Sequence, residues 1–182
     1  SDVCSSDLAA AITVVSVLLG DVLLSWGAPG DQLGRLERWL YAYGLGMTAA
    51  SLLTQGLGLA GGLNRWILGS LAAVVVGLWL QRRRAVAMES TPSDPASLLL
   101  LTAAPFVLLA ALAAALPTTD YDALAYHLLG PKEYFLEGRI RFLPHNVYTT
   151  FPFLTEMFPL LGMVALDDWR TGGLAGQIVL ST

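Results

Sequence analysis

The sequence predicts an all-α integral membrane protein, a multi-pass helical bundle with five complete transmembrane helices and a truncated sixth. Hydrophobic residues make up 55% of the 182 residues, and charged residues only 13%. The mean hydropathy is +0.61. Several apolar runs reach the length of about 18 residues that a membrane-spanning helix needs. A soluble core of this size has no need for such runs.

Apolar stretches mark the expected membrane helices. Tryptophans lie at or next to the ends of these stretches, where amphipathic indole rings settle at a membrane interface. They are Trp26, Trp39, Trp66, Trp79 and Trp169. The stretches interpreted as complete helices are 9–26, 39–60, 66–80, 97–116 and 148–166, and a further run after Thr171 is incomplete.

The basic residues indicate the sidedness of these helices. Arg82, Arg83 and Arg84 close the third stretch, and arginine and lysine are enriched in cytoplasmic loops. With these arginines in the cytoplasm, the polar segment after the fourth stretch is extracytoplasmic. We therefore expect a location in the bacterial inner (plasma) membrane, with residues 117–147 outside.

Composition divides the chain into four parts. Residues 1–8, SDVCSSDL, resemble a translated sequencing adapter and are interpreted as an artefact. Residues 9–84 form an N-terminal part of three membrane helices, and 85–96 form a cytoplasmic linker rich in proline, serine and threonine. Residues 97–182 begin a second module, whose loop at 117–151 contains short interfacial helices.

The polar segment 117–157 holds both histidines, the only lysine and five acidic residues. Polar groups are expensive inside a membrane, so this cluster predicts an aqueous site at the outer membrane face. Solvated loops are charged in any case, which leaves an ordinary surface loop as the alternative. Thr119 and Asp122 suit the start of a short helix, and Pro131 suits the first turn of a second helix that ends near Gly138.

This region contains the series Asp122, Tyr126, Gly138, Pro144, Tyr148, Pro152 and Gly162. The series resembles the first extracytoplasmic loop and following helix of the GT-C glycosyltransferases. The branch concerned uses polyprenyl-phosphate sugars and contains protein mannosyltransferases and aminoarabinose transferases. The resemblance covers about residues 97–166. Two positions depart from the family. Asp122 and Ala123 stand where an Asp-Glu pair is common, and the second acid here precedes them as Asp120. Phe151 stands where lysine commonly precedes proline.

The resemblance implies an inverting transfer of a sugar from a lipid-phosphate donor to an acceptor hydroxyl. Such a transfer needs a base that removes the hydroxyl proton, and a carboxylate can do this. Asp122 is the expected catalytic base, and Asp120 is its rival. Asp122 can also be explained as a helix cap alone.

The remaining predicted site residues are expected to bind substrate. Arg139 and Arg141 suit a phosphate clamp, and Lys132 suits a single positive charge, although each can instead meet lipid headgroups. The other predicted substrate-binding residues are Tyr126, His127, His145 and Glu156. As alternatives, Tyr126 suits an aromatic belt at the interface, His127 suits interfacial hydrogen bonds and Glu156 suits stabilisation of a helix dipole.

The expected partners are a lipid-linked sugar donor and membrane lipids, and the acceptor is not specified. A net charge of −4 without a basic stripe argues against nucleic acid. No cofactor is specified, and two histidines indicate a metal only weakly, so a divalent metal stays possible. Two other classes compete. A transporter or flippase would depend on Asp21 and Gln55, and a membrane assembly subunit would have no catalysis.

Overall fold

The computed structural model describes residues 2–27, 33–85, 104–106, 108–110, 112–113, 126–150 and 153–181, and within this part it contains helices and no strand. The prediction of an all-α chain is confirmed for these residues. The three long helices are α1 (Asp2–Gly27), α2 (Arg35–Leu59) and α3 (Arg65–Ala85). The shorter elements are α5 (Leu129–Glu137), the 3-10 helix η2 (Val147–Thr150), α6 (Met157–Leu166) and α7 (Trp169–Leu180).

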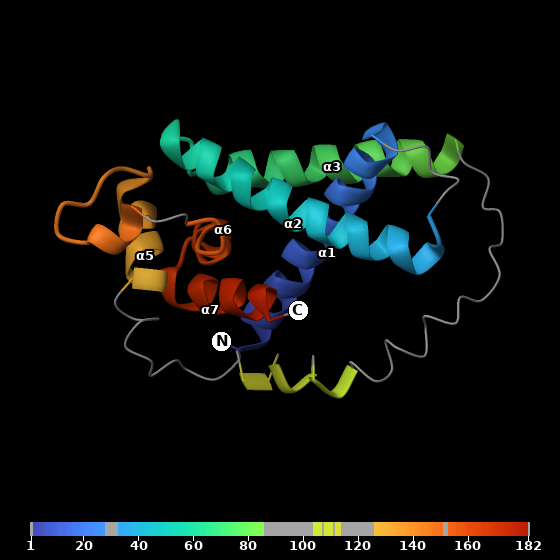
Figure 1. Ribbon diagram of the computed structural model, residues 1–182. Coiled ribbons are helices and arrows are strands. Elements are labelled where there is room, and N and C mark those ends of the chain that lie inside the picture. The colour runs from blue at the N-terminus through green and yellow to red at the C-terminus, as the bar shows by residue number, and fades with distance from the viewer. Residues whose placement is uncertain are drawn as a thin grey trace.

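Figure 1 shows α2 and α3 running along one side of the molecule, with α1 crossing beneath them. The α6–α7 hairpin lies below α2, and α5 stands at one end of the molecule. Residues Asp2–Asp7 belong to α1, which is one continuous helix.

Small residues allow α1 and α2 to pack closely. A side-chain carbon added to Gly20 would collide with the backbone of Ala42, and one added to Gly46 would collide with the backbone of Ser16. Close backbone approach at glycine is a common way of packing apolar helices. An ion pair of 2.8 Å between the Arg38 Nε and the Asp21 Oδ1 also joins the two helices.

The α6–α7 hairpin is held in the same way. Added side-chain carbons at Gly162 and Gly176 would collide with the backbones of Gly172 and Pro159 respectively. The turn between the helices has Asp167 in the left-handed region, with φ of 56°. Asp168 then caps α7, accepting hydrogen bonds from the backbone N–H groups of Arg170 (3.4 Å) and Thr171 (3.0 Å).

The buried core has two clusters that meet at α6. The first joins α5, the segment after it and one face of α6, and the second joins the other face of α6 to α1 and α7. The first contains Tyr134, Leu143, Phe153, Met157, Leu160 and Val164, and the second contains Ala9, Ile12, Phe158, Ala175 and Val179.

The segment that carries most of the predicted site is attached to α2. α5 ends at Gly138 in the left-handed conformation, with φ of 68°, which glycine adopts without strain. The chain then turns back, and the Ile140 N–H donates a 2.8 Å hydrogen bond to the Gly58 carbonyl. Ser51 donates its hydroxyl proton to the Leu154 carbonyl.

The predicted short helix that contains Pro131 and ends near Gly138 is confirmed as α5.

The prediction of five complete transmembrane helices is wrong. Within the described part, only α1 is long and apolar enough to cross a membrane, over residues Cys4–Gly27. The expected helix at 39–60 forms as α2 but contains threonines and Gln55, which lower its hydropathy. The expected helix at 66–80 forms as α3, but its apolar part is short and lies between arginines.

The expected helix at 148–166 is not continuous. It is divided into η2 and α6, and α6 has ten residues, about 15 Å of helix and half the thickness of the hydrocarbon core. Pro159 lies in the first turn of α6, where proline is tolerated. The apolar residues of the 148–166 stretch instead fill the core. The expected helix at 97–116 and the linker at 85–96 lie mostly outside the described residues.

Candidate functional site

The structure describes seven of the nine predicted site residues. The two proposed catalytic bases, Asp120 and Asp122, lie outside the described residues. Of the other seven, three come together at the start of α6, and the rest lie in separate interactions around α5.

His127 and Glu156 form the central pair of the site. The His127 Nδ1 lies 2.5 Å from the Glu156 Oε1, and the Thr155 hydroxyl donates a 2.8 Å hydrogen bond to the Glu156 Oε2. The Glu156 side chain is only 6% exposed, whereas that of His127 is 44% exposed. A buried carboxylate is costly unless it is paired, so this pairing explains the position of Glu156.

Local structure positions both partners. His127 lies in the turn before α5, and Glu156 lies immediately before α6, where a negative charge is favoured by the helix dipole. The hydrogen bond to Glu156 fixes the imidazole through Nδ1, while the His127 side chain stays partly exposed.

Aromatic rings continue this site. The Tyr126 ring stacks on the Tyr148 ring, with centroids 5.1 Å apart and an interplanar angle of 24°. The Tyr126 and His127 rings have centroids 4.1 Å apart. Tyr148 is half exposed, at 50%. The arrangement places an aromatic surface beside the histidine and carboxylate pair.

Two of the other predicted residues form surface pairs. The His145 Nε2 lies 3.0 Å from Glu133, and Arg141 forms a double hydrogen bond to the Glu137 carboxylate. This hydrogen bonding holds the pKa of Glu137 below its usual value. Arg141 is therefore already engaged by a carboxylate of its own loop. Arg139 is exposed, and its backbone N–H closes the end of α5.

The Lys132 side chain points towards α7 and not towards another positively charged side chain of the predicted site. Its Nζ lies 3.8 Å from the centroid of the Trp169 ring, a distance typical of a cation–π interaction. The predicted phosphate site of Lys132, Arg139 and Arg141 is thus divided between different partners. Sequence reasoning missed Thr155 and Trp169 as partners of site residues, because neither belongs to a motif with its partner.

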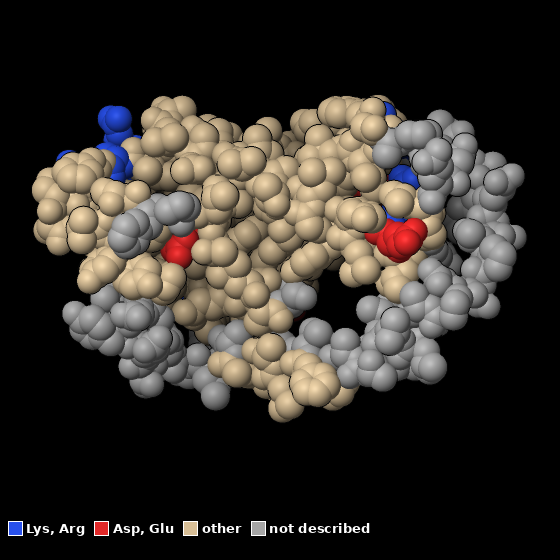
Figure 2. Space-filling model, viewed as in Figure 1, with Lys and Arg blue, Asp and Glu red and all other residues tan. Residues whose placement is uncertain are grey.

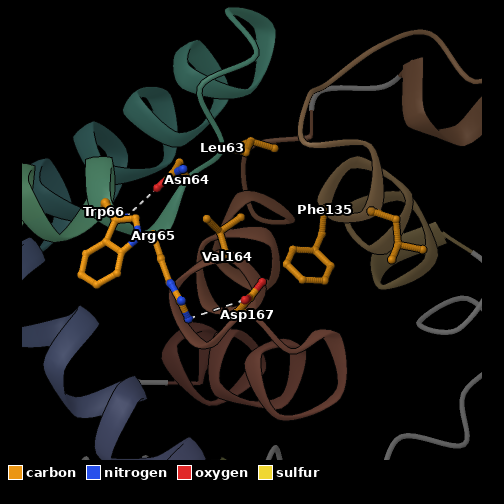
Figure 3. Close-up of a pocket in the computed structure, with 8 residues that line it drawn as sticks. Leu63, Asn64, Arg65, Trp66, Phe135, Val164 and Asp167 are labelled. Carbon is orange, nitrogen blue, oxygen red and sulfur yellow. Dashed lines mark hydrogen bonds and ion pairs between the residues drawn. The ribbon is translucent and has the colours of Figure 1, made fainter.

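A cavity of about 350 Å³ lies between the start of α3, α5 and the end of α6. Figure 3 shows the Arg65 and Asp167 side chains meeting within it, and their charged atoms are 3.5 Å apart. The Asn64 side chain caps α3 by accepting a 2.8 Å hydrogen bond from the Trp66 N–H. Sequence reasoning did not select this cavity. Its lining residues are Leu63, Asn64, Arg65, Trp66, Phe135, Leu136, Val164 and Asp167.

Among the described residues, His, Cys, Asp and Glu side chains do not gather in groups of three or more that could hold a metal ion. Comparison with family models, with curated proteins and with solved structures found no match to this chain.

Proposed function

We propose that this chain is part of a membrane-bound glycosyltransferase. It transfers a sugar from a lipid-phosphate donor to an acceptor hydroxyl, with inversion, on the extracytoplasmic side of the bacterial inner membrane. The observation that carries the proposal is the His127–Glu156 pair beside the stacked rings of Tyr126 and Tyr148. The resemblance to GT-C glycosyltransferases includes both tyrosines.

In the proposed reaction the acceptor oxygen attacks the anomeric carbon of the sugar and loses its proton to a carboxylate. The bond between that carbon and the phosphate oxygen breaks, and the phosphate leaves with the electron pair. Asp122 is the proposed base, and Asp120 is the alternative. A base of this kind contributes about 10²- to 10⁴-fold to the rate.

His127 is the proposed phosphate-binding residue. The hydrogen bond between Nδ1 and Glu156 holds the partly exposed imidazole in one orientation. In its charged form the ring donates a hydrogen bond from Nε2 and stabilises negative charge on the leaving phosphate. The stacked rings of Tyr126 and Tyr148 offer a flat apolar surface to a sugar.

The pairing of Asp21 counts against a transporter. A transporter would use an ionisable group in a spanning helix for its substrate, but here Asp21 in α1 forms a 2.8 Å ion pair with Arg38. A membrane assembly subunit would use the same loop for docking and would tolerate neutral replacements of its carboxylates and histidine.

The test is a transfer assay with full-length protein in membranes and a radiolabelled polyprenyl-phosphate sugar. We expect Asp122→Asn or Asp120→Asn to lower kcat by about 10²-fold or more. His127→Gln should lower kcat by roughly tenfold through the loss of one charged hydrogen bond. Glu37→Gln, a distant carboxylate at the start of α2, is the matched control and should keep full activity. Unchanged transfer by the Asp120→Asn, Asp122→Asn double variant would refute the proposal.

A further inference from the structure

A second cavity, of about 280 Å³, forms an apolar groove that is lined by α1, α2 and α3, together with Leu161 and Ala165 of α6. We call it the α2–α3 groove. It is lined almost entirely by apolar and small side chains, and its single charged lining residue among those described is Arg65. From α3 the groove is lined by Arg65, Leu68, Gly69, Leu71, Ala72 and Val75.

The length of the groove matches one leaflet of a bilayer. Its lining residues on α3 run from Arg65 to Val75, which is about 15 Å at the helical rise of 1.5 Å per residue. The hydrocarbon core of a bilayer is about 30 Å thick. An acyl chain from one leaflet therefore fits along the groove from end to end.

The polar end of the groove suits an anionic headgroup. Arg65 lines both the α2–α3 groove and the cavity of Figure 3, so one guanidinium stands where the apolar and polar spaces meet. The Arg65 guanidinium also lies 5.2 Å from the centroid of the Trp66 ring. Trp66 is 72% exposed, and indole rings are enriched at membrane interfaces.

The partner of Arg65 does not exclude an anion. Asp167 is 3.5 Å away, and the two side chains are 50% and 63% exposed. Exposed ion pairs of this kind contribute little, and a guanidinium has donors for a second oxygen acceptor.

The surroundings of the groove are those of a lipid-facing surface. Within the described part of the chain, α1 is the helix that is long and apolar enough to cross a membrane, and it lines the groove. Uncharged residues cover most of the molecular face over α2 in Figure 2. Leu53 and Leu71, which line the groove, are 47% and 37% exposed. We propose that the groove binds one acyl chain of an anionic phospholipid, whose phosphate lies at Arg65.

Gly69 allows a direct test of the chain site. A side-chain carbon added at Gly69 or at Gly77 meets nothing within 4 Å, and only Gly69 lines the groove. Gly69→Phe should fill the groove without disturbing α3, and Gly77→Phe is the matched control on the same helix. Full-length protein is equilibrated with vesicles of equal phosphatidylglycerol and phosphatidylcholine and extracted in mild detergent. Native mass spectrometry then counts the retained lipid.

The wild type and Gly77→Phe should retain one phospholipid, mainly phosphatidylglycerol. Gly69→Phe should retain roughly tenfold less, since displacing two methylene groups is already sufficient for that loss. Equal retention by Gly69→Phe and Gly77→Phe would overturn the proposal. So would a wild-type dimer, seen by light scattering, that Gly69→Phe dissociates, because a second copy would then occupy the groove.

A separate test of the headgroup site at Arg65 does not depend on the folding of Gly69→Phe. Arg65→Gln should lower the preference for phosphatidylglycerol over phosphatidylcholine by roughly fivefold. Asp167→Asn breaks the same ion pair but keeps the cation, and should preserve or increase that preference. An unchanged preference in Arg65→Gln, or an equal loss in both variants, would contradict a phosphate at Arg65.

Discussion

Glu156 shows how a single residue can organise a site. Its carboxylate is buried, and each oxygen has a partner, His127 on one side and Thr155 on the other. Because burial of an unpaired carboxylate is so unfavourable, the position of His127 is tied to the packing of α6. The orientation of the imidazole is thus a consequence of the core as well as of the loop.

Asp168 provides a pH-dependent contribution to stability. The Thr171 hydroxyl and backbone N–H both donate to its carboxylate and hold its pKa below the usual 3.8. The folded protein therefore binds this proton less readily than the unfolded chain. The stabilisation is present above about pH 3.8 and is lost as the pH falls through the lowered pKa of the folded state.

We predict that Asp168→Ala lowers the free energy of unfolding by about 1 kcal/mol near neutral pH, as loss of a helix cap does. The difference from the wild type should shrink as the pH falls below about 3.8. Urea unfolding over a pH series measures both effects. Asp168→Asn keeps a cap acceptor that does not titrate, so it should stay near wild-type stability at neutral pH without this dependence. A constant difference at all pH values would contradict the prediction.

At the scale of elements, glycines on different helices have opposite roles. Gly162 lies where α6 and α7 touch, and an added side-chain carbon there collides with the backbone of Gly172. Gly77 in α3 faces open space. The same substitution should therefore have opposite effects at the two positions.

Gly162→Ala should destabilise the protein by about 1–3 kcal/mol through overpacking. Gly77→Ala should stabilise it by up to about 1 kcal/mol, because alanine favours a helix over glycine. Thermal or urea unfolding of the two variants in detergent compares them directly. If Gly162→Ala left stability unchanged or raised it, the close packing of α6 on α7 would be refuted.

At the scale of the whole molecule, the apolar surface and α1 predict membrane association. Exposed large apolar side chains are numerous on α2 and α3, and contiguous patches of this kind mark membrane or partner surfaces. Of the apolar 18-residue window of α1, 28% is buried, and many of its other residues are half-buried where α1 packs against α2, α3 and α7.

The expressed chain should remain in the membrane pellet after carbonate extraction. Val14 in α1 is 55% exposed, and Val14→Lys should raise the cost of insertion by roughly 3 kcal/mol and release a substantial fraction. Val14→Leu is the control and should stay in the pellet. Wild-type protein in the soluble fraction would contradict a membrane role for α1.

The sequence predicted local features more reliably than spans or contacts. The helix end at Gly138 was predicted because a glycine after an apolar helix permits the left-handed turn. The helix predicted over 148–166 is not continuous in the structure. Hydropathy counts apolar residues, but it does not show that these residues pack against α5 and α7. Tyr126, His127 and Glu156 were each selected, but the spacing of 29 residues between His127 and Glu156 carries no signal that they pair.

The sequence by itself determined the helical character of the chain, the apolar length of α1 and the ends set by glycine and aspartate. These depend on neighbouring residues and on the conformations that each residue allows. Only the tertiary structure decided that Glu156 is buried against His127, that Lys132 lies on Trp169 and that Arg65 joins two cavities. Each of these joins residues from different elements, and their energies arise only when packing brings the elements together.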